Sequence, residues 1–335
     1  MPDHTRKREV GRGERALPGL WRLRLPLPWP GVPHCNAWAI GAGSGIVLVD
    51  TGMHEPGSEA HLDRALSQVN LKVETVRLLV CTHAHSDHYG QAATIVRRAG
   101  CELWMHPDHE HMRAAATDPE AALTQRIEVA RQSGVPEAPL EAYREAASGR
   151  GYGVAEYVPP DRDLLPGVQV QTDLGAWDVI ETPGHAPSHI CLFQPEKRLL
   201  ISGDHLLGRV SLFYDYGWSP DPVGEFLGSL ERVEALDARL CLAGHGRTFA
   251  DVQSHIDANR TLVHERLEKV AAVLTGSGPL TAFAVVPLAY EAPVTQMNAN
   301  WWLSETLCYL THLEVLGRVA RLPGEGGEPE RWTPV

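Results

Sequence analysis

The chain has 335 residues, of which 43% are hydrophobic, and its formal net charge at pH 7 is -12. This length favours about two domains, and the negative charge disfavours nucleic-acid phosphates as partners. No run of about 18 apolar residues is present, and no hydrophobic segment follows the basic N-terminal residues. We therefore expect a cytoplasmic protein with no membrane partner. The six cysteines include no Cys-x-x-Cys pair, which favours buried free thiols.

The N-terminal part of the chain predicts a tail followed by strands. Residues 1–19 are polar and rich in arginine, which predicts a mobile tail. After a proline-rich turn, residues 36–40 and 46–49 predict a hairpin around the glycines of GAGSG. The second strand of that hairpin ends at Asp50, directly before Thr51 and Gly52.

Four potential metal ligands are concentrated in LLVCTHAHSDHYG, residues 78–90. The apolar residues 78–81 predict a buried strand and residues 89–99 predict a helix, so the ligands should lie on a strand-to-helix loop. On extended backbone His83 and His85 point the same way, whereas the adjacent Asp87 and His88 diverge. One pair can hold one cation and the next pair a second.

Residues 106–165 predict a helical insertion. The segments PEAALTQRIEVARQ and APLEAYREAA are helical in composition, and residues 108–163 contain eleven acidic and six basic residues. An insertion here can form a lid or a pocket wall, with Tyr143, Tyr152 and Tyr157 as candidate pocket residues. We expect the nearby histidines at 106, 109 and 111 to lie at a solvated helix N-terminus rather than to form a separate metal site.

Three later stretches repeat the pattern of an apolar strand that ends in a turn and a potential ligand. They are WDVIETPGH, RLLISGD and RLCLAGH, which end at His185, Asp204 and His245. If these strands lie in one sheet and point the same way, their ligands converge at one edge with those of residues 83–88. Imidazole and carboxylate suit Zn²⁺ and similar cations.

In order and context these motifs resemble the metallo-β-lactamase superfamily, over roughly residues 32–250. The resemblance implies a four-layer α/β/β/α sandwich over residues 20–255, and it assigns His83, His85 and His185 to a first metal. It assigns Asp87, His88 and His245 to a second, with Asp204 as the bridge.

The resemblance also suggests candidate catalytic residues. Besides the ligand Asp87, they are Asp50, which would brace a metal-bound histidine from behind, and Tyr214 or Tyr216, which would polarise a substrate carbonyl. The alternative for Asp50 is a turn-forming role before Gly52. Helices followed by a short terminal hairpin, residues 256–335, resemble a winged-helix domain.

The function implied is that of a hydrolase with two divalent metal ions. Zn²⁺ is preferred, Fe and Mn stay open, and a bridging hydroxide would cleave a small acyl ester or thioester, as in the glyoxalase II-like branch. The alternatives are a phosphodiesterase or endoribonuclease acting on single-stranded RNA, a lactonase or β-lactamase, and a redox or binding protein on the same scaffold. Zinc β-lactamases generally lack the bridging Asp, and flavodiiron relatives carry Glu in place of the second His.

The C-terminal segment carries more acidic than basic residues. From Cys308 to the end, the chain contains three arginines, at 318, 321 and 331, and four glutamates, at 314, 325, 328 and 330. A net negative surface is poorly suited to phosphates, so we expect no nucleic-acid partner. We expect this segment to pack on the core or on a second subunit, which leaves a homodimer open.

Overall fold

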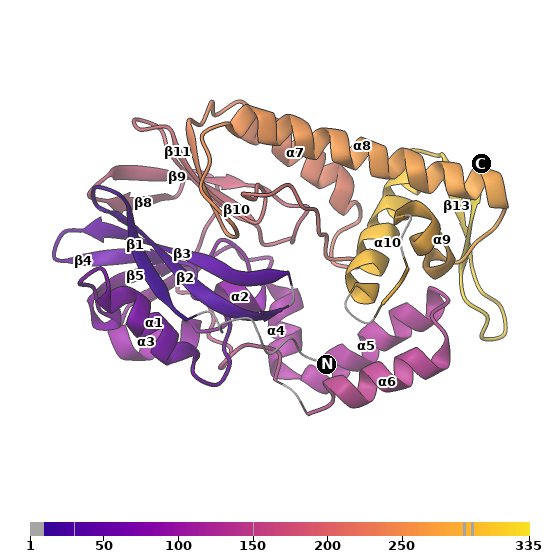
Figure 1. Ribbon diagram of the computed structural model, residues 1–335, viewed down its shortest axis with the longest axis horizontal. Helices are drawn as coiled ribbons and strands as arrows, with labels where there is room; N and C mark the ends of the chain where they lie inside the picture. The colour runs from indigo at the N-terminus through magenta and orange to yellow at the C-terminus, as the bar shows by residue number, and fades with distance from the viewer. Residues whose placement is uncertain (1–9, 30, 150, 291–292, 296–297) are drawn as a thin grey trace.

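Two β-sheets form the centre of the molecule (Figure 1). The computed structural model describes residues 10–29, 31–149, 151–290, 293–295 and 298–335. The first sheet has the order β1-β2-β3-β4-β5-β6-β7, and the second has the order β12-β11-β10-β9-β8. The strands of the first sheet are β1 (Arg12–Leu17), β2 (Leu20–Trp29), β3 (Val32–Ala42), β4 (Gly45–Val49), β5 (Val76–Val80), β6 (Glu102–Met105) and β7 (Arg162–Asp163). Those of the second are β8 (Gln169–Thr172), β9 (Gly175–Glu181), β10 (Ile190–Gln194), β11 (Leu199–Gly203) and β12 (Leu240–Ala243).

The direction of the strands brings several strand ends to one edge. Strands β4, β5, β6 and β7 are parallel to one another, and β11 is parallel to β12. The predicted hairpin is formed by β3 and β4, which turn at Gly43, where φ is 61° and a residue without Cβ is favoured. The carboxyl ends of β4, β5, β11 and β12 carry the residues that the sequence analysis singled out.

Hydrophobic side chains define the layers. One buried cluster, which includes Trp38, Val80, Trp177 and Ile201, joins the two sheets. A second cluster joins the first sheet to the helices α1 (Ser58–Ser67) and α3 (Ala92–Ala99), with the short η1 (Val73–Thr75) beside them. A third joins the second sheet to α7 (Pro222–Glu234) and α8 (Val252–Ser277). These layers confirm the predicted α/β/β/α sandwich.

The predicted insertion consists of α4 (Glu110–Thr117), α5 (Pro119–Gln132) and α6 (Glu137–Ala147). Asp118 caps α5 by accepting a hydrogen bond from Ala121 N, and Pro119 occupies the first helical position. Leu123, Ile127 and Leu140 form a small buried cluster between α5 and α6. In Figure 1 these two helices lie below the C-terminal helices.

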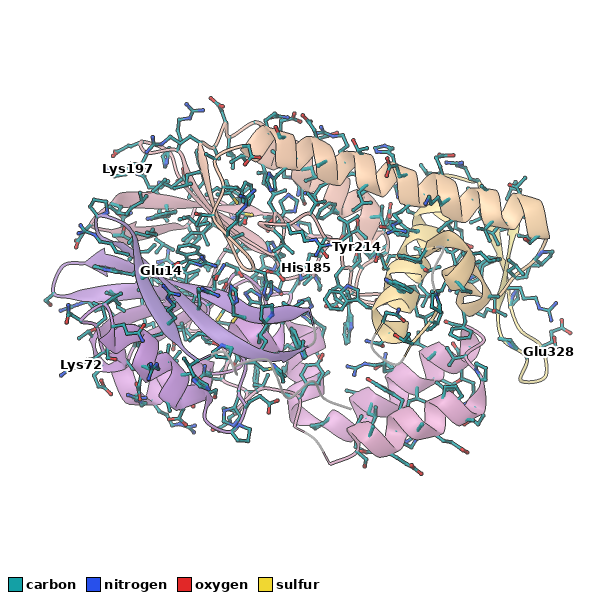
Figure 2. The ribbon with its side chains drawn as sticks, viewed as in Figure 1. Glu14, Lys72, His185, Lys197, Tyr214 and Glu328 are labelled. Carbon is teal, nitrogen blue, oxygen red and sulfur yellow. The ribbon has the colours of Figure 1, made fainter. Side chains whose placement is uncertain are left out.

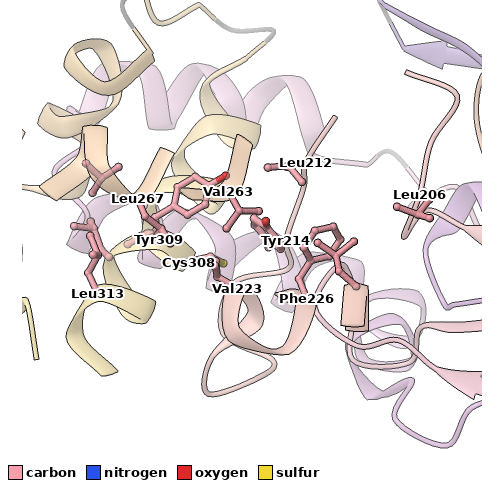
Figure 3. Close-up of a cluster of buried hydrophobic side chains, with 14 of the residues drawn as sticks. Leu206, Leu212, Tyr214, Val223, Phe226, Val263, Leu267, Cys308, Tyr309 and Leu313 are labelled. Carbon is pink, nitrogen blue, oxygen red and sulfur yellow. The ribbon is translucent and has the colours of Figure 1, made fainter. Parts of the chain in front are cut away.

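The C-terminal part comprises α9 (Ala282–Tyr290), α10 (Ala299–Val315), β13 (Val319–Leu322) and β14 (Arg331–Pro334). Its apolar residues belong to the same cluster as α7, α8 and the second sheet, so it has no core apart from theirs among the described residues. Figure 3 shows this packing, in which Cys308 of α10 lies near Val223 of α7, and Leu313 and Phe226 lie on opposite sides of this pair. The predicted boundary at residue 255 falls inside α8, and the winged-helix assignment stays a prediction.

The N-terminal prediction is partly wrong. Residues 12–17 form β1, which pairs with β2 and packs against α1, because Gly11 N and Gly13 N donate to side chains of α1 and of the turn after it. Residues 1–9 lie outside the described residues. The six cysteines are all free and buried, as expected. Within the described chain, no helix combines the length and the apolar character needed to span a bilayer.

Candidate metal centre

The dense ligand motif follows β5 directly, as predicted. His83 and His85 lie on the loop after β5, and Asp87 and His88 lie in the short helix α2 (Ser86–Tyr89). Because Asp87 and His88 are helical rather than extended, their side chains do not diverge: His88 Nε2 lies 3.4 Å from Asp87 Oδ2. The loop thus directs two adjacent pairs of donors to one side.

Three histidine nitrogens converge in the first donor set. His83 Nε2 lies 3.0 Å from His85 Nδ1, and His185 Nε2 lies 2.9 Å from the same His85 nitrogen. His185 comes from the loop after β9, so the two sheets meet at this point (Figure 2). Burial lowers the pKa of His83 well below its usual value and that of His185 to about 4, so both imidazoles are neutral and present lone pairs.

The second donor set combines Asp87, His88 and His245. His245 follows β12, and its Nε2 lies 3.1 Å from Asp87 Oδ2 and 3.4 Å from His88 Nε2. Asp204 follows β11 and lies between the two sets. Its Oδ2 is 3.1 Å from His245 Nε2 and 3.7 Å from His185 Nε2. Asp204 therefore lies close to a histidine of each donor set.

The electrostatics and hydrogen bonding of this second set fit a bound cation. Burial alone would lower the pKa of His88, but the carboxylates of Asp87, Asp204 and Asp50 raise it well above its usual value. Burial would also lower the pKa of His245, and Asp204 and Asp87 raise it to about 10. The field therefore favours positive charge between these donors. Asp204 Oδ1 is buried and lies 3.3 Å from His88 Nε2, but it accepts no hydrogen bond of normal geometry from the described residues, although buried oxygens normally do.

Asp50 contacts histidines of both sets from behind. Its Oδ2 lies 2.9 Å from His88 Nδ1, and its Oδ1 accepts a hydrogen bond from Thr82 N at 2.8 Å. The Thr82 hydroxyl donates to the same carboxylate and lies 3.1 Å from His83 Nδ1. Both histidines are thereby held with Nε2 facing the other ligands. Asp50 itself has φ 66°, a left-handed conformation that is uncommon for a residue other than glycine.

The remaining three histidines are oriented in the same way through the ring nitrogen that faces away from the centre. His85 Nε2 lies 2.7 Å from Asp215 Oδ2, His185 Nδ1 lies 3.1 Å from the Phe213 carbonyl, and His245 Nδ1 lies 2.9 Å from the His34 carbonyl. Carboxylate or carbonyl partners of this kind fix the tautomer and ring direction of metal-bound histidine. The inner nitrogens are therefore prepared as ligands.

The two predicted tyrosines do not reach this centre, which corrects their assignment. Tyr214 is fully buried and packs edge-on against Phe226 and Tyr309 in the hydrophobic cluster of α7 and α10 (Figure 3). Tyr216 packs at the edge of the same cluster, where burial raises its pKa and Arg321 of β13 lowers it. Neither phenol makes a described contact with the metal-ligand candidates.

Asp215, between the two tyrosines, is the residue that sequence reasoning missed. Burial would raise its pKa, but the charge and hydrogen bond of His85 lower it. His111 of α4 lies 3.9 Å from Asp215 Oδ2 and is buried, which corrects the expectation of a solvated histidine. His189 accepts a hydrogen bond from Asp204 N at 3.0 Å and so supports the shared ligand. The only signal for Asp215 in the sequence was a carboxylate within FYDYG.

Comparisons with known proteins agree with this geometry. The model of the metallo-beta-lactamase superfamily matches residues 30–245, which include all seven ligand candidates. The chain therefore belongs to the metallo-beta-lactamase superfamily. Its fold is the metal-binding hydrolase fold of that family, and the donor sets described above are its candidate sites for divalent metal ions.

Several relatives are similar over most of the chain. "Probable metallo-hydrolase YqjP" of Bacillus subtilis is 27% identical over 81% of this chain and 85% of its own. "Atrochrysone carboxyl ACP thioesterase" of Claviceps purpurea is 23% identical over 78% of this chain and 66% of its own. Among solved structures, a metallo-beta-lactamase family protein of Thermus thermophilus has a TM-score of 0.81 and 28% identity, covering 96% of this chain and 100% of its own. A beta-lactamase domain protein of Burkholderia ambifaria has a TM-score of 0.84 and 26% identity, covering 100% and 97%.

Proposed function

We propose that this protein hydrolyses small acyl thioesters or esters with two divalent metal ions, preferentially Zn²⁺. The observation that carries the proposal is the position of Asp204, whose carboxylate lies within 4 Å of histidines from both donor sets. Seven donors, one of them the shared carboxylate, exceed what a single tetrahedral Zn²⁺ uses. When bound, such ions supply Lewis acidity and lower the pKa of water toward neutrality.

The chain's own residues have distinct tasks in this proposal. His83, His85 and His185 hold one ion, Asp87, His88 and His245 hold the other, and Asp204 fixes the spacing between them. Asp50 and Asp215 keep three of the imidazoles in the tautomer that binds a metal. Because neither Tyr214 nor Tyr216 faces the site, we assign no tyrosine to the substrate carbonyl in this function.

The preference for a thioester comes from the relatives. The matching proteins of Claviceps purpurea and of Aspergillus fumigatus are both named "Atrochrysone carboxyl ACP thioesterase", and they cover 78% and 71% of this chain. A thioester carbonyl is an electrophile that a metal-assisted hydrolase can attack without further cofactors. We therefore place the substrate in the class of small acyl thioesters.

Charge on the C-terminal hairpin argues against nucleic acid as the substrate. Arg318 pairs with Glu268 at 2.7 Å, Arg321 lies 3.7 Å from both Glu314 and Glu330, and Arg331 lies 3.8 Å from Glu328. Guanidinium groups that already pair with carboxylates contribute little to phosphate binding, which depends on unpaired cations. The nuclease alternative is accordingly the weaker one.

A substrate panel tests the proposal. Metal-loaded protein is assayed against thioester, lactone, β-lactam and single-stranded RNA substrates, together with the variants Asp204→Ala and Asp178→Ala. Asp178 lies on β9 and contacts Gln169, so it serves as the control. We expect thioester hydrolysis that falls by orders of magnitude in Asp204→Ala and is unchanged in Asp178→Ala. Cleavage of RNA or lactam without thioester turnover would refute the proposed function.

A further inference from the structure

Arg126 is the one arginine of α4, α5 and α6 that pairs with no carboxylate in the described structure. On the same helices, Arg113 pairs with Glu110, Arg131 with Glu128 and Glu137, and Arg144 with Glu120. The Arg126 guanidinium instead donates to the Tyr143 hydroxyl at 3.0 Å, and its Cζ lies 5.8 Å from the centre of the Tyr152 ring. The side chain is partly buried, although the surrounding segment is rich in glutamate. A partly buried cation without an acidic partner is a natural site for an anion that the protein does not itself supply.

The loop that carries Tyr152 connects the surroundings of Arg126 with the metal-binding loop. Gly153 packs so closely on the metal-binding loop that an added Cβ would lie 3.2 Å from the Cβ of Ser86, the residue between His85 and Asp87. Backbone hydrogen bonds from His54 N to Gly153 O, at 2.8 Å, and from Ala155 N to Gly90 O, at 2.9 Å, fix the loop on both sides. Tyr152, whose ring Arg126 approaches, thus adjoins in sequence a residue that packs on the loop carrying the ligand candidates.

Electrostatic coupling supports the same placement. Burial lowers the pKa of Arg126, but Tyr143, Tyr152 and Asp215 raise it above its usual value. Burial raises the pKa of Tyr152, Arg126 lowers it, and Asp215 raises it. Both side chains thus lie within the field of Asp215, which hydrogen-bonds the ligand candidate His85.

We propose that Arg126, with the hydroxyls of Tyr143 and Tyr152, binds an anionic group of the substrate, a carboxylate or phosphate, and so selects acidic thioesters for the metal centre. The set contains one guanidinium and two phenols, so its only formal charge is positive and its N–H and O–H groups can donate to an anion. The net charge of -12 repels anions at long range, so an acidic substrate needs a local cation near the metals. The selection of acidic thioesters for turnover rests on the proposed thioester hydrolysis, whereas the binding of an anion at Arg126 does not.

Matched substrates separate the two sources of the anion. Hexanoyl and adipoyl groups have the same chain length, and only adipoyl ends in a carboxylate; each is carried on N-acetylcysteamine, which is neutral, or on coenzyme A, which carries phosphates. The kcat/KM of all four thioesters is measured with zinc-loaded wild type, Arg126→Gln, Arg126→Lys and the control Arg131→Gln. Arg131 lies on the same helix but pairs with Glu128 and Glu137 at the surface.

The expected result is a loss confined to charged substrates. Arg126→Gln should lower kcat/KM by about 10- to 100-fold, mainly through KM, either for adipoyl thioesters or for those of coenzyme A, because one charge-assisted contact is removed. Arg126→Lys should retain most of the preference, and Arg131→Gln all of it. An equal loss on all four substrates would assign Arg126 a positioning role instead, and no loss at all would also overturn the proposal.

A binding measurement keeps the inference independent of turnover. Adipamate, hexanamide, adenosine 3′,5′-bisphosphate and adenosine are titrated calorimetrically into zinc-loaded wild type and the same variants. We expect an anionic probe to bind more tightly than its neutral counterpart, and Arg126→Gln to remove the difference while metal content stays unchanged. If no thioester is cleaved but this difference is found, the proposed reaction fails and the anion site stands. Equal binding of charged and uncharged probes by wild type would refute the site.

Discussion

At the scale of single residues, Asp50 orients metal-ligand candidates through the ring nitrogens that face away from the metal centre. Its two oxygens reach His88 directly and His83 through Thr82, so one carboxylate orients histidines that belong to different donor sets. Asp215 does the same for His85 alone. The two residues therefore differ in how many ligands depend on them.

That difference predicts unequal effects of substitution. Losing a partner of a metal-bound histidine typically costs about 10- to 100-fold in metal affinity or activity. We expect Asp215→Asn to weaken one metal site, and Asp50→Ala to weaken both and to lower turnover further. Competition with a zinc chelator, which resolves two affinities, measures this. Unchanged affinities in Asp50→Ala would reduce Asp50 to a turn-forming residue.

For Tyr214 we expect the reverse of the result for Asp50, namely that substitution leaves activity almost unchanged. A phenol that polarised the substrate carbonyl would contribute about 2 to 4 kcal/mol to transition-state stabilisation. Because Tyr214 is fully buried against Phe226 and Tyr309, we expect Tyr214→Phe to keep kcat/KM within about twofold of wild type. A loss of kcat/KM of about 30-fold or more with unchanged metal content would restore Tyr214 to the site.

The ligand candidates could be predicted from sequence because most of them lie within a few residues of the end of an apolar strand. His83 and His85 follow β5, Asp204 follows β11 and His245 follows β12. Asp215, Tyr214 and Tyr216 lie in an irregular segment between β11 and α7, where no periodicity tells which of three adjacent side chains faces inward. Only the packing of α7 and α10 around Tyr214 decides this, and that packing involves residues distant in sequence.

At the scale of elements, α10 contributes a buried carboxylate to the core. Glu305 is 6% exposed, and its Oε1 accepts a hydrogen bond from the Tyr309 hydroxyl at 2.7 Å. Burial raises the pKa of Glu305 from 4.5 to about 7, although the Tyr309 hydrogen bond and Arg266 lower it. The folded protein thus retains a proton that the unfolded chain releases near pH 4.5.

This proton makes the stability of the protein depend on pH. Between pH 4.5 and 7 the folded state binds more protons than the unfolded state at this group, so its contribution to stability is full below 4.5 and is lost as pH rises through 7. We expect Glu305→Gln to become more stable than wild type by up to about 3 kcal/mol across this interval. Urea unfolding of both proteins at several pH values measures the difference, with Glu328→Gln as an exposed control. A difference that does not grow with pH would contradict this.

Helices were predicted more successfully than the first strand. The composition of residues 119–132 matches α5, because an Asp cap, a Pro at the first position and a run of good helix formers act locally. Strand β1 was predicted as a tail because its polar residues carry no alternation. Its order comes from pairing with β2 and from contacts with α1, which the local sequence does not encode.

At the scale of the whole molecule, the C-terminal part completes the hydrophobic core. Leu303, Leu307, Leu310 and Leu313 of α10 are buried in the cluster that also covers the second sheet. We expect removal of residues 277–335 to expose this surface, so that the truncated protein aggregates before it loses metal. Light scattering and elemental analysis of the truncated protein measure both. A monodisperse truncated protein with full metal content would show that the metal-binding part folds independently.

We propose that two metal ions act together at the edge where both sheets meet. Titration of metal-free protein with Zn²⁺, while hydrolysis of a small acyl thioester is followed, tests this claim most directly. Because Asp204 contacts both donor sets, we predict that the rate rises to a plateau at two equivalents per chain and that Asp204→Ala shows no such plateau. A plateau at one equivalent, or hydrolysis that does not depend on added metal, would contradict the account.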